Sequence, residues 1–176
     1  MLKTSEEIRN IALRTIREEA TAISQLSNYL TKDFEDCVKL ILNSQGRVIV
    51  TGIGKSANIA SKLVSTLNST GTPSIFMHAA DAIHGDLGMI RNEDIVICLS
   101  KSGDTPEIKV LIPLIKTMGN KIIAFTGNAD SFLSHNADYF LNTTVQREAC
   151  PNNLAPTAST TAQLVMGDAL AVALLD

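Results

Sequence analysis

Two short runs of apolar residues, at 95–99 and 122–125, constrain the fold of this chain more than any other feature. Their hydrophobicity is continuous rather than alternating, which is typical of strands buried on both faces. Three further runs, at 48–50, 74–77 and 139–145, bring the expected strands to five, with helical stretches between most of them. This alternation predicts an α/β fold: a three-layer α-β-α sandwich with a five-stranded, parallel, doubly wound sheet. Ligands of such sheets bind beyond the carboxyl ends of the strands.

The first 45 residues have helical periodicity instead. Thr4 and Glu7 match a capping box, and a second helix is expected between Thr31 and Gly46. The first helix has an apolar face that can dock on a partner subunit or cover its own sheet. That face comprises Ile8, Ala12, Ile16, Ala20, Ile23, Leu26 and Leu30.

The later helices are expected at 56–70, 105–118, 130–136 and from about 159 to the end. Pro113 falls inside one of them and would kink it. We expect one domain over 1–176, with a helical segment at 1–45 and a parallel α/β core at 46–176.

Composition narrows the class of protein. The net charge is −3 and the 15 Lys and Arg are scattered, which argues against a nucleic-acid surface. The three cysteines form no C-x-x-C pair, so a reducing compartment is expected. The charged start of the chain does not resemble a signal peptide, and no apolar run approaches the roughly 20 residues of a membrane span. We therefore expect a cytoplasmic protein with no membrane partner.

The loop after the run at 95–99 is the best candidate for a ligand site. Ser100, Ser102 and Thr105 place three hydroxyls around Gly103, and Pro106 suits the first position of a helix capped by Thr105. Hydroxyls and free backbone N–H groups at a helix start form a phosphate cradle. The alternative is a well-capped helix that needs no ligand. One hydroxyl would suffice for capping, so three favour the cradle.

The loop at 52–56 reads Gly-Ile-Gly-Lys-Ser. It is not a nucleotide P-loop, because Ile49 stands where the first glycine is required. It fits the dinucleotide pattern only loosely, with Ala57 for the third glycine and His78 in place of an acidic residue. Two glycines, a helix start and Lys55 still predict an anion site, although a plain tight turn is an equal alternative.

The histidines carry less specific information. His84 lies among glycines, where an exposed imidazole can titrate near neutral pH. A metal site made by His78, His84 and Asp86 is possible, but the spacing is not diagnostic. His135 is expected to be solvated.

Two residues after the run at 139–145 have alternative interpretations. Glu148 is either a functional carboxylate or one half of a surface ion pair with Arg147. Cys150 has no neighbouring histidine to activate it and is expected to be a small buried residue.

The chain resembles the KpsF/KdsD-type arabinose-5-phosphate isomerases of the sugar isomerase (SIS) superfamily over about residues 4–176. The S-x-S-G-[DE]-T pattern marks the superfamily, and its combination with the other segments is far more specific. The matching segments are GIGKSANIASKL (52–63), STGTPSIFMHAADAIHGDLGMI (69–90), SKSGDTPEI (100–108) and REACPNNLAPTASTTAQLVMGDALAVALL (147–175).

The resemblance implies an activity as well as the five-stranded fold. The family interconverts D-ribulose 5-phosphate and D-arabinose 5-phosphate, which supplies the sugar for Kdo in lipopolysaccharide or capsule. The resemblance also implies a homotetramer and a reaction that needs neither metal nor redox cofactor. The implied active-site residues are Lys55, His84, Glu107 and Glu148.

The resemblance and the chemistry together suggest roles for these residues. We assign the substrate phosphate to Ser100, Ser102 and Thr105, with Gly54, Ser56 and Thr157 as further substrate-binding residues. Lys55 would polarise the carbonyl, and the base would be Glu148 or a histidine. Glu107 lies in a helix first turn, where the dipole weakens it as a base, so it would orient a hydroxyl.

Two family features do not occur within these 176 residues. Longer members carry paired CBS regions, and the family has a histidine in an S-H-P-G-G-x-L-G segment soon after the final helix. The sequence given ends at Asp176, before that segment, so the identity of the base stays open. Without CBS regions, a product of the Kdo pathway could bind the cleft itself and act as a feedback inhibitor.

Two other functions compete with this isomerase. SIS domains also serve as phosphosugar sensors, which need the phosphate hydroxyls but not four ionisable groups. A hexulose-phosphate isomerase is the other alternative, and the EACP and HGDLG segments favour the pentose enzyme instead.

Overall fold

The computed structural model describes residues 3–176, so Met1 and Leu2, the first residues of the predicted domain, lie outside it. The strands are β1 (Val48–Gly52), β2 (Ser74–His78), β3 (Ile95–Leu99), β4 (Lys121–Thr126) and β5 (Tyr139–Asn142). The helices are α1 (Ser5–Leu26), α2 (Lys32–Leu42), α3 (Lys55–Ser69), α4 (Ala79–Ala82), α5 (Pro106–Met118), α6 (Phe132–Asn136) and α7 (Ala158–Leu175), with short 3₁₀ turns η1 (Ser27–Tyr29) and η2 (Asp86–Met89).

The five strands form one parallel sheet in the order β2-β1-β3-β4-β5, which confirms the predicted fold class. The chain leaves β1 first toward β2 and later returns to β3 on its other side. The carboxyl ends of β1 and β3 are adjacent, with Gly52 opposite Leu99. Ligands bind at such a switch point in doubly wound sheets.

The fifth strand is shorter than its apolar run predicts. It ends at Asn142, whose side-chain oxygen accepts a hydrogen bond from the backbone N–H of Thr144 at 2.8 Å. This local bond turns the chain away from the sheet, and residues 143–145 therefore do not extend the strand.

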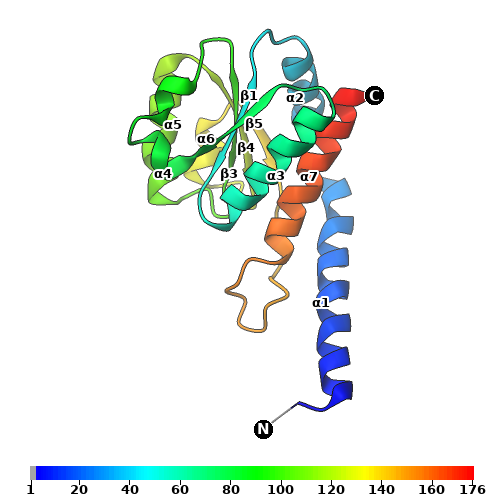
Figure 1. The fold of residues 1–176 in the computed structure, drawn as a ribbon. Coiled ribbons are helices and arrows are strands. Elements are labelled where there is room, and N and C mark those ends of the chain that lie inside the picture. Colours follow the sequence, from blue (N-terminus) through cyan, green and yellow to red (C-terminus); the bar gives the residue numbers. More distant parts are fainter. Residues whose placement is uncertain (1–2) are drawn as a thin grey trace.

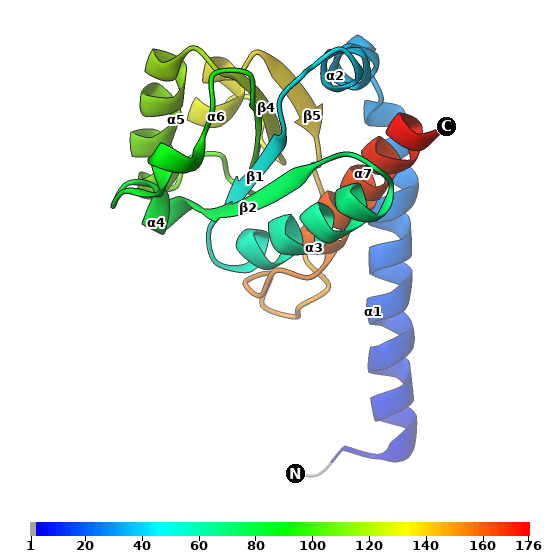
Figure 2. The same ribbon diagram turned by 45° about the horizontal axis from the view of Figure 1, so that its top comes forward.

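Helices cover both faces of the sheet, as Figures 1 and 2 show. On one face α2, α3 and α7 pack through Cys37, Leu63 and Met166 against one set of strand side chains. On the other, α4, α5 and α6 pack against the opposite set. Because successive strand residues point to opposite faces, the continuous apolar runs fill both cores at once.

Helix α7 is long and apolar enough to span a membrane by length and composition alone. In this fold, however, it is a core helix. Ala162, Met166 and Leu170 are buried against the sheet, and Asp168 pairs with Lys62 of α3 at 2.5 Å.

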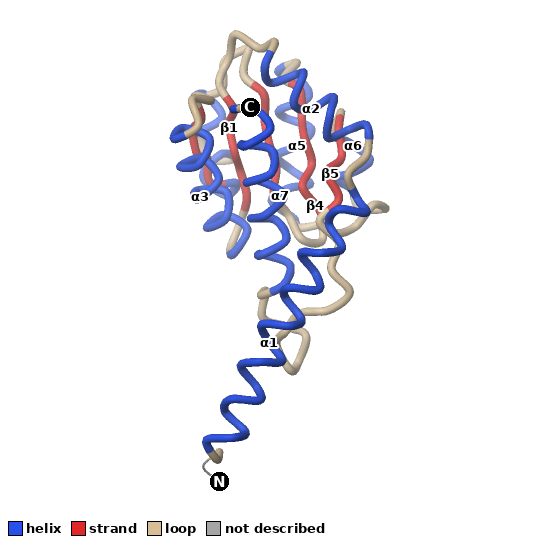
Figure 3. Tube along the Cα trace, turned by 90° about the vertical axis from the view of Figure 1, so that its right-hand side faces the viewer, coloured by secondary structure: helices blue, strands red, loops and turns tan. Residues whose placement is uncertain are grey.

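Helix α1 is only partly covered by the rest of the domain. Ala22 and Leu26 are buried near its end, whereas Ile8 and Ile16 are 57% and 65% exposed. The helix runs beside α7, and its first half extends beyond the edge of the sheet where α7 begins (Figures 1 and 3). Of the two alternatives for the apolar face, covering its own sheet is therefore wrong for this half of the helix.

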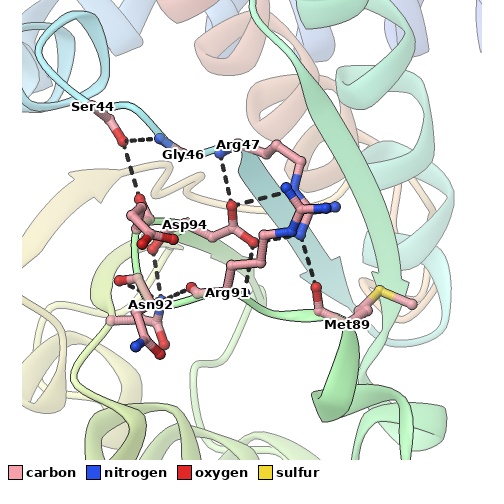
Figure 4. Close-up of polar contacts among 9 residues, drawn as sticks. Ser44, Gly46, Arg47, Met89, Arg91, Asn92 and Asp94 are labelled. Carbon is pink, nitrogen blue, oxygen red and sulfur yellow. Dashed lines mark hydrogen bonds and ion pairs between the residues drawn. The ribbon is translucent and has the colours of Figure 1, made fainter.

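A network of hydrogen bonds around the Arg47–Asp94 ion pair joins the amino ends of β1 and β3 (Figure 4). Arg47 Nη2 lies 2.6 Å from Asp94 Oδ2 and donates to the Met89 carbonyl at 2.8 Å. Burial would raise the pKa of Asp94, but hydrogen bonds from Arg47 and the Arg91 backbone hold it below its ordinary value. Gly46, predicted to stop a helix, is instead required here: a Cβ would lie 2.1 Å from the Glu93 carbonyl oxygen.

Helix α5 follows the predicted boundaries closely. Pro106 occupies its first turn, Gly119 ends it with φ 86°, and it continues past the exposed Pro113 to Met118. The kink expected at Pro113 stays a prediction.

Candidate functional site

A cavity of about 220 Å³ lies at the switch point between β1 and β3. Helices α3, α5 and α7 all begin at this cavity, each contributing residues from its first turn or from the loop before it. Helix starts carry partial positive charge and free N–H groups, so those of α3 and α5 favour an anion here, whereas the first N–H groups of α7 bond an internal carboxylate, Glu148. The lining residues are Ile53, Lys55, Ser56, Ser100, Lys101, Ser102, Thr105, Pro156, Ser159 and Thr160.

The three hydroxyl residues of the phosphate-cradle hypothesis, Ser100, Ser102 and Thr105, all line this cavity. Ser100 Oγ accepts a hydrogen bond from Gly103 N at 3.1 Å, and Ser102 Oγ accepts one from Asp104 N at 3.2 Å. Thr105 occupies the N-cap of α5, but its side chain makes no capping bond. Its hydroxyl oxygen is buried and has no partner among residues 3–176. Helix capping therefore does not explain Thr105, and a ligand would.

Gly103 gives this loop its shape. Its φ of +69° is unfavourable for any residue with a side chain, and a Cβ would lie 2.2 Å from Ser131 Oγ. Its carbonyl accepts a hydrogen bond from Leu133 N at 3.0 Å, which ties the loop to the start of α6. The cradle thus rests on a backbone position that only glycine can occupy without strain.

The loop after β1 brings a lysine to the same cavity. Gly54 (φ +59°) precedes α3, and exposed Lys55 is the first residue of that helix. Ser56 Oγ donates to Gln163 Oε1 of α7 at 3.2 Å. Gln163 is buried, and its Nε2 has no hydrogen-bond partner among the described residues.

Glu148 is buried behind the cavity wall rather than paired on the surface with Arg147. Its Oε1 lies 2.7 Å from Lys101 Nζ and accepts from Ser159 Oγ at 2.5 Å. Its Oε2 accepts from the backbone N–H groups of Thr157 (2.9 Å) and Ser159 (3.1 Å). Arg147 lies 3.8 Å from Glu18 of α1 instead. The surface ion-pair alternative is therefore wrong.

These contacts set the basicity of Glu148. Burial alone would raise its pKa, but hydrogen bonds from Lys101, Ser159 and the first N–H groups of α7 lower the pKa to about 2. Such a carboxylate is a weak proton acceptor at neutral pH. Its contacts suit it to holding Lys101 and the start of α7 in place.

The remaining predicted site residues do not line this cavity. His84 is exposed in a turn between α4 and η2, two short elements that the sequence did not predict. Glu107 is half-buried in the first turn of α5. Thr157 lies one step behind the wall, where its hydroxyl is 3.2 Å from Glu148 Oε2.

No group of three His, Cys, Asp or Glu side chains within residues 3–176 is arranged to hold a metal ion. His78 Nδ1 lies 3.9 Å from Asp81 Oδ2, and His135 is exposed as expected. Cys150 is only partly buried. Backbone N–H groups, first that of Ala155, lower the pKa of its thiol. The expectation that Cys150 is a small buried residue is therefore wrong.

Sequence reasoning missed four polar residues at the site: Lys101, Ser159, Thr160 and Gln163. Lys101 stands between two predicted residues, so its place in the hydroxyl loop was an available indication. The other three belong to the apolar helix α7, where Ser159 and Gln163 are polar residues on the buried face and Thr160 is partly exposed.

The family model that describes the SIS domain matches residues 41–173. The chain belongs to the SIS domain family. This confirms the superfamily inferred from the S-x-S-G-[DE]-T loop. Substrate binding at Ser100, Ser102 and Thr105, in the loop after β3, stays a prediction.

Similar SIS proteins have names that agree with the resemblance. A Haemophilus influenzae protein named "Probable arabinose 5-phosphate isomerase" is 52% identical over 94% of this chain and 49% of its own length. Arabinose 5-phosphate isomerase KdsD of Pseudomonas aeruginosa is 51% identical over 94% of this chain and 51% of its own. This chain therefore spans about half the length of the curated relatives it matches.

A solved structure matches over nearly its whole length. An Escherichia coli CFT073 protein in complex with arabinose 5-phosphate is 39% identical, with a TM-score of 0.94 over 98% of this chain and 92% of that chain. The two proteins thus share the entire fold described above.

Proposed function

We propose that this chain interconverts D-ribulose 5-phosphate and D-arabinose 5-phosphate. The observation that carries the proposal is the cavity where three helices begin, with its cluster of hydroxyls, the unpartnered Thr105 hydroxyl and Lys55. The names of the relatives and the sugar-phosphate complex of the structural neighbour support the same substrate class.

The reaction is an aldose–ketose isomerisation. From arabinose 5-phosphate, the C2–H bond breaks, a base takes the proton, and the electron pair forms a C1=C2 enediolate. The aldehyde oxygen receives a proton, and the C2 hydroxyl loses one as C2 becomes the carbonyl. A proton then returns to C1, which gives ribulose 5-phosphate with no net gain or loss of electrons.

We assign the phosphate to Ser56, Ser100, Ser102 and Thr105, all of which line the cavity. The backbone at Gly54 allows close approach of the anion. Lys55, at the rim, would polarise the carbonyl and stabilise the enediolate.

The carboxylates and His84 have different roles in this proposal. With its low pKa and buried carboxylate, Glu148 acts as a positioning residue rather than as the base, together with Thr157. Among the candidates that the resemblance implies, His84 is then the remaining base, and it would have to reach the sugar from its exposed turn beside the cavity, while Glu107 orients a substrate hydroxyl.

The test is an isomerisation assay with a panel of phosphorylated pentoses and hexoses. We expect turnover of arabinose 5-phosphate, reduced by at least about a hundredfold in Lys55→Ala and His84→Ala. Turnover of a hexulose phosphate alone would contradict the proposal. Tight binding of arabinose 5-phosphate without turnover would identify a sensor instead.

We also propose a domain organisation, an oligomeric state and a cellular location for the enzyme. Residues 1–176 would form one SIS domain, because α2 packs into the same core as the sheet through Cys37 and Ile41. We expect a homo-oligomer, a tetramer by family resemblance, with the exposed face of α1 as one contact. Charged sugar phosphates do not cross membranes freely, so the enzyme would act in the cytoplasm.

Feedback by a product of the Kdo pathway is part of the same proposal. A product that carries phosphate would compete for the hydroxyls of the cavity. Titration of the assay with the activated end product should raise the apparent KM for the sugar phosphate. An unchanged rate at every concentration would contradict the proposed feedback inhibition.

A further inference from the structure

Lys101 is a cation of the cavity wall whose charge already has a partner inside the protein. Its Nζ lies 2.7 Å from Glu148 Oε1, yet 47% of the lysine side chain is exposed while the glutamate is fully buried. The Lys101 carbonyl is fixed by hydrogen bonds from Gly127 N (3.1 Å) and Thr126 Oγ1 (3.2 Å). The ammonium can therefore reorient within the cavity while the loop stays in place.

The anchoring of Glu148 does not depend on Lys101. Its other hydrogen bonds come from the backbone N–H and hydroxyl groups of Thr157 and Ser159. All of them lie at the start of α7, where the helix dipole also favours a carboxylate. If Lys101 moved away, Glu148 would stay charged and held. The ion pair can thus open at its lysine end.

A bound phosphate would compete for Lys101. The hydroxyls of Ser100, Ser102 and Thr105 line the same cavity as the lysine, so a phosphate among them is within its reach. A phosphate monoester has a charge of about −1.5 to −2, more than a carboxylate, and forms strong charge-assisted hydrogen bonds. An unneutralised Glu148 behind the wall would repel the same phosphate.

We propose that Lys101 exchanges partners when a phosphorylated ligand binds. It neutralises Glu148 in the free protein and moves onto the phosphate in the complex. The inference rests on the proposed function in taking a sugar phosphate as the ligand. Its consequence is that the two partners of one ion pair affect binding with opposite signs: Lys101 strengthens it, and Glu148 opposes it by holding the lysine.

The test is calorimetric titration with inorganic phosphate. Lys101→Met should weaken binding about tenfold or more, the usual worth of a charged hydrogen bond. Glu148→Gln should bind phosphate as tightly as the unmodified protein, or several-fold more tightly. Equal weakening in both variants would mean that the ion pair is only structural and would overturn the inference.

Lys109 provides a matched control. Its side chain is 48% exposed and pairs with Asp104 at 3.1 Å, but it does not line the cavity. Lys109→Met should therefore change phosphate binding by less than about twofold. A loss equal to that of Lys101→Met would contradict the assignment to Lys101.

A replacement variant and a parallel turnover assay complete the test of the partner exchange by Lys101. If Glu148→Gln does not fold, Lys101→Arg replaces it: it should retain binding that Lys101→Met loses, and equal affinity of the two would overturn the inference. Isomerase turnover is measured in parallel. Normal turnover with unchanged phosphate binding and KM in Lys101→Met contradicts the inference alone. The expected phosphate pattern without turnover contradicts the proposed function alone.

Discussion

Glu148 bears its charge inside the protein, and this makes stability depend on pH. Its ordinary pKa of 4.5 is lowered to about 2 in the folded chain, so its ionised form contributes stability above pH 4.5 that is lost as the pH falls toward 2. The contribution is roughly 3 kcal/mol at about 1.4 kcal/mol per pH unit. Glu148→Gln should lack this component.

Urea unfolding of both proteins between pH 7 and pH 2 checks this prediction. The difference in unfolding free energy should shrink through that acid range, since Asp94 and other carboxylates cancel between the two proteins. Parallel stability curves for the two proteins would show that Glu148 does not titrate as described.

Gly103 and Gly119 allow the cost of backbone strain at positive φ to be separated from the cost of a steric clash when alanine replaces glycine. Both have positive φ, but a Cβ at Gly103 would meet Ser131, whereas none of the described atoms lies within 4 Å at Gly119. Gly119→Ala should cost about 1 kcal/mol for the backbone alone, and Gly103→Ala about 3 kcal/mol. Chemical denaturation measures both. Equal losses would indicate that the loop at Gly103 can move away from Ser131.

At the scale of single residues, the hydroxyl loop at 100–105 could be recognised from the sequence, whereas the buried ion pair could not. Ser100, Ser102 and Thr105 were predicted to bind phosphate because three hydroxyls beside a helix start exceed what capping needs, and all three line the cavity. The ion pair of Lys101 with Glu148 was not, because residues 47 positions apart meet only through the order of the strands. The buried environment that lowers the pKa of Glu148 likewise exists only in the folded chain.

Between elements, the contact of α3 with α7 depends on Gly167. A Cβ there would lie 2.9 Å from Leu63 Cδ1, and Leu63 is only 1% exposed. Gly167→Ala should therefore destabilise by about 1–2 kcal/mol, although alanine favours helices. In a Leu63→Ala background, the same change should become neutral or stabilising. Unfolding free energies of the four proteins test this, and an unchanged sign would mean that Leu63 repacks freely.

The elements themselves were predictable where a pattern was long enough. The continuous runs gave β3 and β4 within one residue, because burial on both faces leaves no room for polar residues. The four-residue helix α4 and turn η2 were missed, since neither is long enough for a helical period. Their position around His84 follows from tertiary packing.

At the scale of the whole molecule, the apolar runs did not predict the order of the strands in the sheet. They therefore could not predict that the loops after β1 and β3 meet to form one site. The exposed first half of α1 is also a property of the assembled fold. Its periodicity predicted an apolar face but could not say what covers it.

That face leads to a prediction about assembly. Ile8→Ser together with Ile16→Ser should convert the expected oligomer to smaller species, because two side chains more than half exposed would lose their apolar contact. Sedimentation velocity measures the change. Val110→Ser with Leu114→Ser, an exposed pair on α5, is the control. Dissociation by the control pair alone would place the contact on α5 instead.

Helix α7 also determines the distance between the cavity and Leu175 at the other end of the helix. Its 18 residues begin at the cavity and run along one face of the sheet to Leu175, near the edge where the strands begin (Figure 1). At 1.5 Å per residue, the helix spans about 27 Å. A fluorophore attached at the exposed Leu175 would therefore lie about that far from a ligand in the cavity. It would report on ligand binding by energy transfer without standing in the entrance.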